Sequence, residues 1–161
     1  MLRVVNRAPL KLYDWGLGWV YGHRFLRLSH RGRRSGRRYE TMLEVVGWDR
    51  STGEVMVISG FGPGSDWFRN LQAHPALEIC VGHERFVPRQ RFLGEDEAVV
   101  ALAAYEQQHR YARVALRRLF ERTFGRPYDV SDDARRELVR RLPMVAFAPA
   151  GGSADTGRRL R

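Results

Sequence analysis

The chain has 161 residues, a hydrophobic fraction of 43% and a formal net charge of +10 at pH 7. This length allows one domain with its own core, and no apolar run approaches the ~18 residues that cross a bilayer. The first residues carry charges where a signal peptide has its apolar stretch, and the single cysteine, Cys80, excludes an internal disulfide framework. We therefore expect a cytoplasmic protein.

The basic residues are nearly all arginine, since Lys11 is the only lysine. In the segment HRGRRSGRRYET, residues 30–41, arginines are concentrated on what reads as a turn: Arg31, Arg33, Arg34, Arg37 and Arg38. The guanidinium group presents a planar fork of donors that matches phosphate and carboxylate oxygens in pairs. The total charge is typical of a solvated surface, but its concentration on one turn predicts an anion site.

The N-terminal half alternates strands with turns. After a short helix over 7–22, the patterns predict a strand at 25–30, the basic turn, and strands at 39–48 and 54–59 around a loop of turn-forming residues. The glycine-rich GFGPGSDW leads into a helix that ends at Pro75, with one face formed by Trp67, Asn70, Leu71 and His74. Two more strands follow at 76–81 and 84–92, and Pro88 makes the second an edge or a bulge.

The C-terminal half is mainly helical. Residues 95–124 are expected to be helical with a break near His109, and Ser131 caps a further helix with acids in its first turn. A last strand is expected at 144–148, and the tail over 151–161 is expected to be disordered. Six short strands, joined mostly as hairpins, favour an antiparallel sheet curled into a small barrel with capping helices, because closure removes exposed strand edges. We expect a mainly β (α+β) fold and one domain over residues 1–150.

Most catalytic and metal-binding patterns are missing from the sequence. There is no CxxC, HExxH or paired-histidine spacing, so we expect no metal site. The loop GFGPGS does not match a dinucleotide fingerprint, because Ser65 stands where the third glycine belongs. Its backbone amides at a helix N-terminus either form an anion site or belong to a plain turn.

Two segments together carry a family resemblance. The first is the turn Gly32-Arg33-Arg34-Ser35-Gly36, and the second is a helix with Trp67, Asn70, Leu71, Ala73 and Pro75. In this order and spacing they resemble the deazaflavin (F420)-dependent nitroreductase family, a branch of the split β-barrel flavin-binding fold. The resemblance covers residues 25–149. It implies a six-stranded antiparallel split β-barrel of the FMN-binding type.

The resemblance also implies a cofactor and its site. F420 carries a phosphodiester and an oligoglutamate tail, which the arginine turn would hold by charge-assisted hydrogen bonds. The implied cofactor-binding residues are Arg33, Arg34, Ser35, Gly36, Arg38, Thr41, Ser59, Gly60, Trp67 and Asn70. Many relatives have Pro-Arg in place of Arg38-Tyr39, and some have a lysine in place of Phe61. These departures leave FMN as an alternative cofactor, and Trp67 is also explained as a core residue.

The implied reaction is hydride transfer from reduced F420 to a quinone, an enone or a nitro compound. Tyr105, His109 and Tyr111 are the candidate catalytic residues for proton delivery, with Tyr128 as a further candidate. Alternatively, Tyr105 and His109 are half-buried residues that only pack against their neighbours.

Other functions stay open at this point. The protein is alternatively a non-catalytic flavin-, deazaflavin- or lipid-binding barrel, or an FMN-dependent reductase. Nucleic acid is not an expected partner, since Trp48 and Trp67 fall at sheet and helix positions rather than on a stacking platform. The aromatic and basic N-terminal segment either rests on an anionic membrane or closes one barrel mouth. We expect a monomer or a homodimer.

Overall fold

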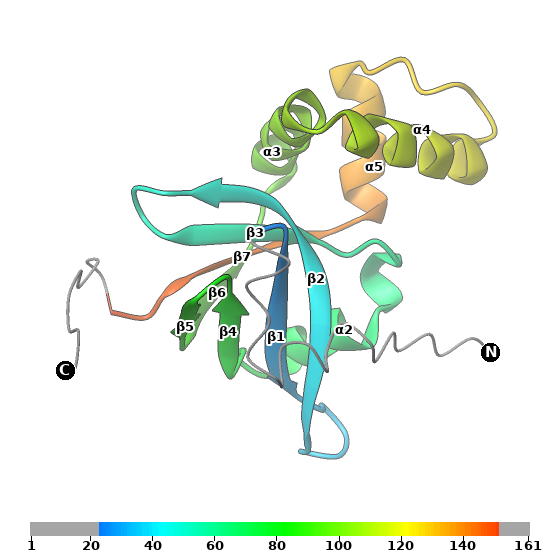
Figure 1. Cartoon of the computed structure of the whole chain (residues 1–161). Helices are drawn as coiled ribbons and strands as arrows, with labels where there is room; N and C mark the ends of the chain where they lie inside the picture. Colours follow the sequence, from blue (N-terminus) through cyan, green and yellow to red (C-terminus); the bar gives the residue numbers. More distant parts are fainter. Residues whose placement is uncertain (1–22, 152–161) are drawn as a thin grey trace.

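Figure 1 shows the computed structural model of the protein, in which residues 23–151 are described. The helix expected over 7–22, its membrane contact and the tail over 152–161 lie outside these residues. The strands are β1 (Phe25–Arg31), β2 (Arg38–Asp49), β3 (Glu54–Ile58), β4 (Glu78–Val81), β5 (Glu84–Phe86), β6 (Pro88–Phe92) and β7 (Met144–Pro149). The helices are η2 (Gly62–Gly64), α2 (Asp66–Ala73), α3 (Glu95–Gln108), α4 (Arg110–Phe124) and α5 (Asp132–Arg141).

The strands form one antiparallel sheet in the order β5-β4-β1-β2-β3-β7-β6. Its two edge strands, β5 and β6, are consecutive in the chain and are separated only by Val87. The sheet therefore curls into a nearly closed barrel, as predicted. The number of strands differs from the prediction. The segment expected as one strand at 84–92 forms two strands, β5 and β6, so the sheet has seven strands rather than six. The chain changes partner from β4 to β7 at Pro88, whose missing N–H cannot continue a ladder.

The barrel interior is filled by the alternate residues of its strands. On β1, β3 and β7 these include Leu26, Leu28, Val55, Val57 and Phe147, all with no exposed surface. Helix α2 closes one mouth of the barrel and adds three large side chains to this core: Trp67, Phe68 and Leu71. Burial of the apolar face of α2 therefore fixes the helix against the strands that carry the arginine turn.

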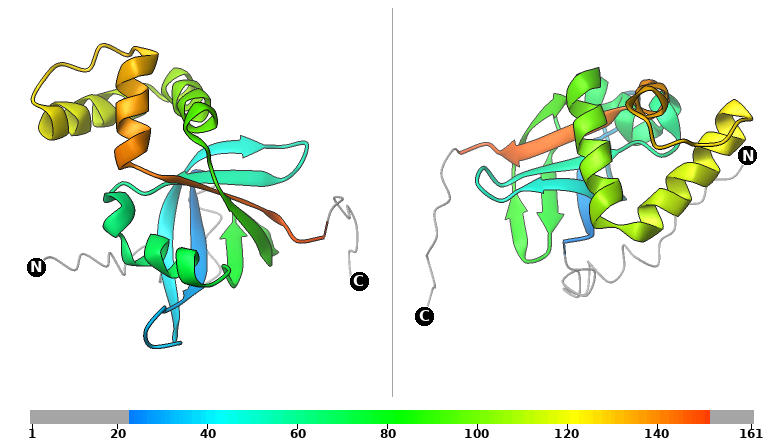
Figure 2. Two further views of the ribbon diagram at one scale, coloured as in Figure 1. Left: turned by 180° about the vertical axis from the view of Figure 1, so that it is seen from behind. Right: turned by 90° about the horizontal axis from the view of Figure 1, so that it is seen from above.

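A second core lies outside the barrel, under α3, α4 and α5. These helices pack on the end of the molecule opposite the arginine turn (Figure 1; the further views of Figure 2 agree). The pairing of β2 with β3 shifts between Val45 and Gly47. Because successive side chains of a strand point to opposite faces, Val45 lies in the barrel core and Val46 in the helical core. The helix break at His109 and the Ser131 cap of α5 are confirmed.

Within the described range, no helix combines the length and apolar character that a membrane crossing requires. Cys80 is a buried free thiol on β4.

Candidate functional site

The arginine turn connects β1 to β2 and has a fixed backbone. The Gly32 amide donates to the Arg37 carbonyl and the Gly36 amide donates to the Gly32 carbonyl, each at 2.8 Å. Gly36 has a φ of 67°, which favours glycine. A Cβ at Gly32 would lie 2.6 Å from both the Ser35 Oγ and the Tyr39 ring. The two glycines therefore allow a tight, crowded turn that other residues would distort.

The arginines of this turn divide into two groups. Arg31, Arg34 and Arg37 are exposed, and their guanidinium groups have no hydrogen bond or ion pair in the described part of the chain. Arg33 and Arg38 are held by the protein. The Arg33 Nη1 donates to Asp66 Oδ1 and to Asn70 Oδ1, both at 3.0 Å, while Arg38 Nη2 donates to Ser29 Oγ at 2.8 Å and to Glu78 Oε1 at 3.3 Å. Three positive charges are therefore available to an anion.

Helix α2 is tied to the turn through a buried amide. Asn70 Oδ1 also accepts from the Arg33 backbone N–H at 3.0 Å, and Asn70 Nδ2 lies 3.0 Å from His30 Nδ1. His30 and Asn70 are each only 4% exposed. Burial lowers the pKa of His30 to about 4, although the Asp66 carboxylate acts in the opposite direction. His30 is therefore neutral at physiological pH and can accept a hydrogen bond.

The glycine-rich loop between β3 and α2 is anchored by two serines. Ser59 is fully buried, and its Oγ donates to the Gly62 carbonyl at 2.7 Å and lies 2.8 Å from the Ser65 Oγ. Ser65 occupies the N-cap position of α2, but its hydroxyl makes no capping bond, because it donates to the Gly62 carbonyl. Gly60 and Phe61 have no backbone partner for their amides among residues 23–151. The Phe61 side chain is 95% exposed.

Two further predicted cofactor-binding residues, Thr41 and Trp67, face the interior of the barrel. Thr41 is half-buried and pairs with Leu28, so it lies on the face of β2 that points into the barrel. Trp67 is 8% exposed and packs edge-to-face on Phe68, with ring centroids 5.8 Å apart. The core explanation of Trp67 is therefore correct, and contact with a cofactor stays a prediction.

The three candidate catalytic residues come together at the junction of α3 and α4. The centroid of the His109 ring lies 5.1 Å from that of the Tyr105 ring and 5.3 Å from that of the Tyr111 ring. The Tyr111 hydroxyl donates to Glu44 Oε1 at 3.2 Å, and the Arg24 guanidinium lies 4.2 Å from the centroid of the Tyr111 ring. We call these five residues, Arg24, Glu44, Tyr105, His109 and Tyr111, the tyrosine cluster.

The environment of the tyrosine cluster suppresses ionisation of its buried phenol. Tyr105 is 5% exposed, and burial, followed by hydrogen bonding with Glu44 and Tyr111, raises its pKa. Tyr128 lies elsewhere: its hydroxyl donates to the buried Glu106 carboxylate, which also accepts from Arg135 Nε at 3.0 Å. Tyr128 therefore joins the loop before α5 to α3 and is not part of the tyrosine cluster.

Most of the predicted site residues thus fall into three groups: the arginine turn, the glycine-rich loop and the tyrosine cluster. The arginine turn is at one end of β1 and β2. Glu44 lies in the middle of β2, opposite Phe25 at the far end of β1, six residues after Arg38 or about 20 Å along the strand. The glycine-rich loop contacts the end of α5, where a Cβ on Gly62 would lie 3.0 Å from the Arg141 carbonyl. Glu44 was not among the sequence candidates, because a glutamate within an alternating strand is ordinary for a solvent-facing position.

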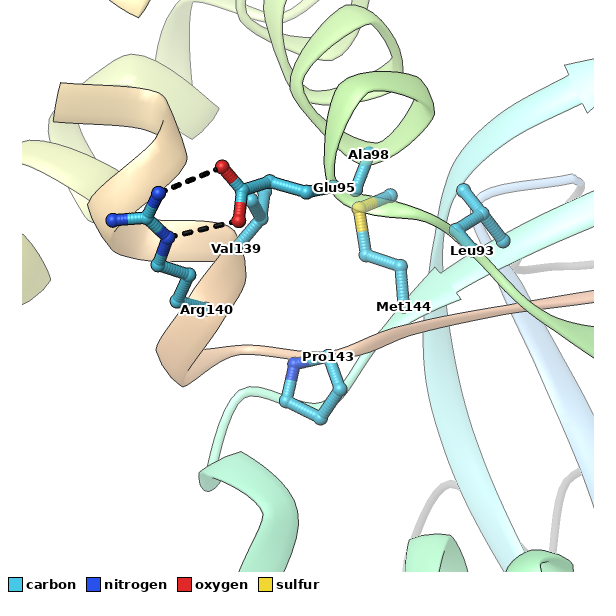
Figure 3. A pocket seen from close by; sticks show the side chains of 7 residues that line it. All are labelled: Leu93, Glu95, Ala98, Val139, Arg140, Pro143 and Met144. Carbon is cyan, nitrogen blue, oxygen red and sulfur yellow. Dashed lines mark hydrogen bonds and ion pairs between the residues drawn. The ribbon is translucent and has the colours of Figure 1, made fainter. Parts of the chain in front are cut away.

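A small pocket of about 120 Å³ lies between α3, α5 and β7 (Figure 3). Leu93, Ala98 and Met144 line it, and the Glu95 carboxylate at its side is paired with Arg140 Nε at 2.8 Å. Pockets for drug-sized ligands measure roughly 300–1,000 Å³. The pocket is therefore too small for a tricyclic cofactor ring, and none of the predicted site residues lines it.

The chain is similar to several solved structures, including the following three. An FMN-binding protein from Nostoc punctiforme PCC 73102, related to pyridoxamine 5'-phosphate oxidase, has a TM-score of 0.54 at 18% identity, with 92% of this chain and 82% of that chain covered. A domain-swapped dimer has a TM-score of 0.47 at 16% identity, covering 89% and 96%. An F420-H2 dependent reductase has a TM-score of 0.45 at 16% identity, covering 78% and 95%. The likeness to the Nostoc protein shows that the fold is that of the FMN-binding split barrels.

Family membership rests on the sequence itself. No curated protein matches the chain. The sequence model of the F420H(2)-dependent quinone reductase family matches residues 16–118, more than half of the chain, including the arginine turn, the glycine-rich loop, α2 and Tyr105, His109 and Tyr111. The chain therefore belongs to the F420H(2)-dependent quinone reductase family, whose members are oxidoreductases that use F420 as cofactor.

Proposed function

We propose that this protein transfers a hydride from reduced F420 to a quinone. The arginine turn binds the tail of the cofactor, and the tyrosine cluster delivers the proton to the reduced quinone. The quinone is inferred from the family, while enones and nitro compounds are the competing acceptors. The FMN alternative is not needed, and the family of reductases replaces the non-catalytic alternatives.

The observation that carries the proposal is the set of unpartnered guanidinium groups on the turn. Arg31, Arg34 and Arg37 have no partner within the described residues, and like charges so close together are unfavourable unless an anion joins them. The phosphodiester and carboxylates of F420 supply several negative charges along one flexible chain. Ser35 and Gly36 are exposed on the same turn, where the backbone can approach a ligand closely. The turn therefore fits a polyanionic tail.

The glycine-rich loop fits the ring end of the cofactor. The free amides of Gly60 and Phe61 can donate to ring carbonyl oxygens, and a Cβ at Gly60 would meet no atom within 4 Å, so the space above it is open. Phe61 extends from the same loop with 95% of its surface exposed. We propose that its ring packs on a planar ligand, because burying a phenylalanine contributes roughly 1.5–3 kcal/mol.

When bound, reduced F420 supplies the hydride, and the protein supplies orientation and a route by which a proton from solvent reaches the acceptor. A quinone that gains a hydride becomes a hydroquinone anion, which takes up one proton. Because the raised pKa of Tyr105 disfavours its anion, we propose that Tyr105 keeps its own proton. Its hydroxyl turns from Glu44 to donate a hydrogen bond to the acceptor oxygen when the substrate is bound. Glu44 holds the Tyr111 hydroxyl, and the half-exposed His109 connects the tyrosine cluster to solvent.

A titration with F420, followed by fluorescence, tests the cofactor site. We expect Arg34→Ala to weaken binding about tenfold at low salt, since a charge-assisted hydrogen bond is worth roughly 1.5–3 kcal/mol. The loss should shrink at high salt, where exposed charges are screened. FMN, which lacks the glutamates, should bind weakly to both proteins.

The matched control is Arg118→Ala. Arg118 is an exposed arginine of α4 without a partner among residues 23–151, so its replacement removes the same charge at a distance from the turn. Its F420 affinity should stay at the wild-type level. Equal affinities of all three proteins at low salt would contradict the role of the turn.

A further inference from the structure

A buried polar chain joins β1, α2 and the arginine turn. Asn70 is its central residue: Oδ1 accepts from the backbone N–H and from Nη1 of Arg33, each at 3.0 Å, and Nδ2 meets His30 Nδ1 at 3.0 Å. Both His30 and Asn70 are 4% exposed, so water does not replace these partners. Both polar atoms of the Asn70 side-chain amide therefore have hydrogen-bond partners within the protein.

The orientation of the Asn70 amide follows from what its neighbours can do. A backbone N–H can only donate, so the oxygen of the amide must face Arg33. The NH₂ group consequently faces His30, whose Nδ1 must be the unprotonated, accepting nitrogen. If the amide turned by 180°, its NH₂ group would face the Arg33 N–H, and two donors would meet in a buried position. The accepting Nδ1 of His30 selects the orientation that holds Arg33.

We propose that His30 is a positioning residue for the anionic tail of F420, acting through Asn70 on the backbone of the arginine turn. Arg33 precedes Arg34 directly, and the turn is closed by its own hydrogen bonds between Gly32, Gly36 and Arg37. Anchoring the Arg33 amide therefore places the free guanidinium groups of the turn as a unit. This inference rests on the proposed function, since it gives His30 an effect on cofactor binding.

A purely structural role for His30 makes a different prediction. The His30 ring also stacks on Tyr39, with centroids 6.0 Å apart and planes at 23°, so its loss would disturb packing in general. General damage would weaken the binding of every ligand. Loss of the Asn70 orientation would weaken the binding only of those ligands that contact the arginine turn.

The experiment compares F420 with the deazaflavin riboside, which keeps the ring and ribityl chain and lacks the phosphodiester and glutamates. His30→Asn places an oxygen where Nδ1 stands, whereas His30→Gln carries its oxygen toward the position of Nε2. We expect His30→Gln to raise the Kd of F420 about tenfold, the cost of one misplaced buried hydrogen bond. It should leave the Kd of the riboside unchanged. His30→Asn should keep both constants within about threefold of wild type.

Equal losses for F420 and the riboside, or a His30→Asn protein as weak as His30→Gln, would overturn the positioning role. A wild-type protein that does not bind F420 would instead overturn the proposed function. Wild-type protein labelled with ¹⁵N in its histidines gives a second measurement that does not depend on the folding of a variant. We expect an unprotonated Nδ1 and a protonated Nε2 for His30 at pH 7, and a protonated Nδ1 would contradict the inference.

Discussion

His30 also makes the stability of the protein depend on pH. The pKa of His30 is about 4 in the folded protein, against the usual histidine value of 6.5, so the unfolded chain binds a proton more readily. The contribution of neutral His30 is complete above pH 6.5 and is lost progressively as the pH falls toward 4. A difference of this size corresponds to roughly 3 kcal/mol.

Urea unfolding at pH 7 and pH 4.5 measures this linkage. His30→Asn, which does not titrate, is the control and should lose clearly less stability over the interval. The neighbouring charges are those of Asp66 and Arg33. Parallel losses in both proteins would assign the pH dependence to other groups.

The tyrosine cluster yields a prediction about turnover. If Tyr105 donates a hydrogen bond to the acceptor, Tyr105→Phe should lower kcat with a quinone by about ten- to a hundredfold, the range of one charge-assisted hydrogen bond. The affinity for F420 should be preserved, because Tyr105 lies on α3 beside Glu44, which is six residues along β2 from Arg38. Tyr111→Phe is the comparison: its hydroxyl donates to Glu44, so its loss should act more weakly. Wild-type turnover in both variants would point to solvent or His109.

At the scale of single elements, α5 depends on its cap. The Ser131 Oγ accepts from the Ala134 amide at 3.1 Å, and Asp132 and Asp133 lie in the first turn, where they complement the helix dipole. Removing such a cap costs about 1 kcal/mol. We expect Ser131→Ala to lower the free energy of unfolding by this amount in denaturant titrations. An unchanged value would mean that the Asp residues and the loop before α5 compensate for the lost hydroxyl.

The helices and strands were largely predictable because their signals are local. Alternation marked the strands, the pattern of glycine and arginine marked the turn, and the spacing of Trp67 and Asn70 marked the buried face of α2. The division of residues 84–92 into β5 and β6 could not be predicted, since both parts alternate and only the partner strand changes. Pro88 indicated the position of the irregularity but not its topological consequence.

At the scale of the whole molecule, the sequence does not reveal which residues far apart in the chain contact one another. Arg33 was expected to bind the cofactor tail as freely as Arg34, yet it pairs with Asp66 across 33 positions. Glu44 meets Tyr111 across 67 positions. The candidate residues could therefore be named from the sequence, but which arginines stay free and which groups surround the tyrosines depend on the closed barrel.

The position of β7 in the sheet has a consequence for the order of folding. β7 lies between β3 and β6 and follows both in the chain by many residues, with α3, α4 and α5 in between. Until residues 144–149 have been synthesised, a nascent chain therefore exposes two unpaired strand edges that invite pairing with another chain. A protein ending at Leu142 should be recovered as aggregate rather than as an open barrel, which size-exclusion chromatography can show, and a monomeric product would mean that the barrel is held without β7. The barrel is thus completed only after α5 has been synthesised, by the strand that pairs with both edges at once.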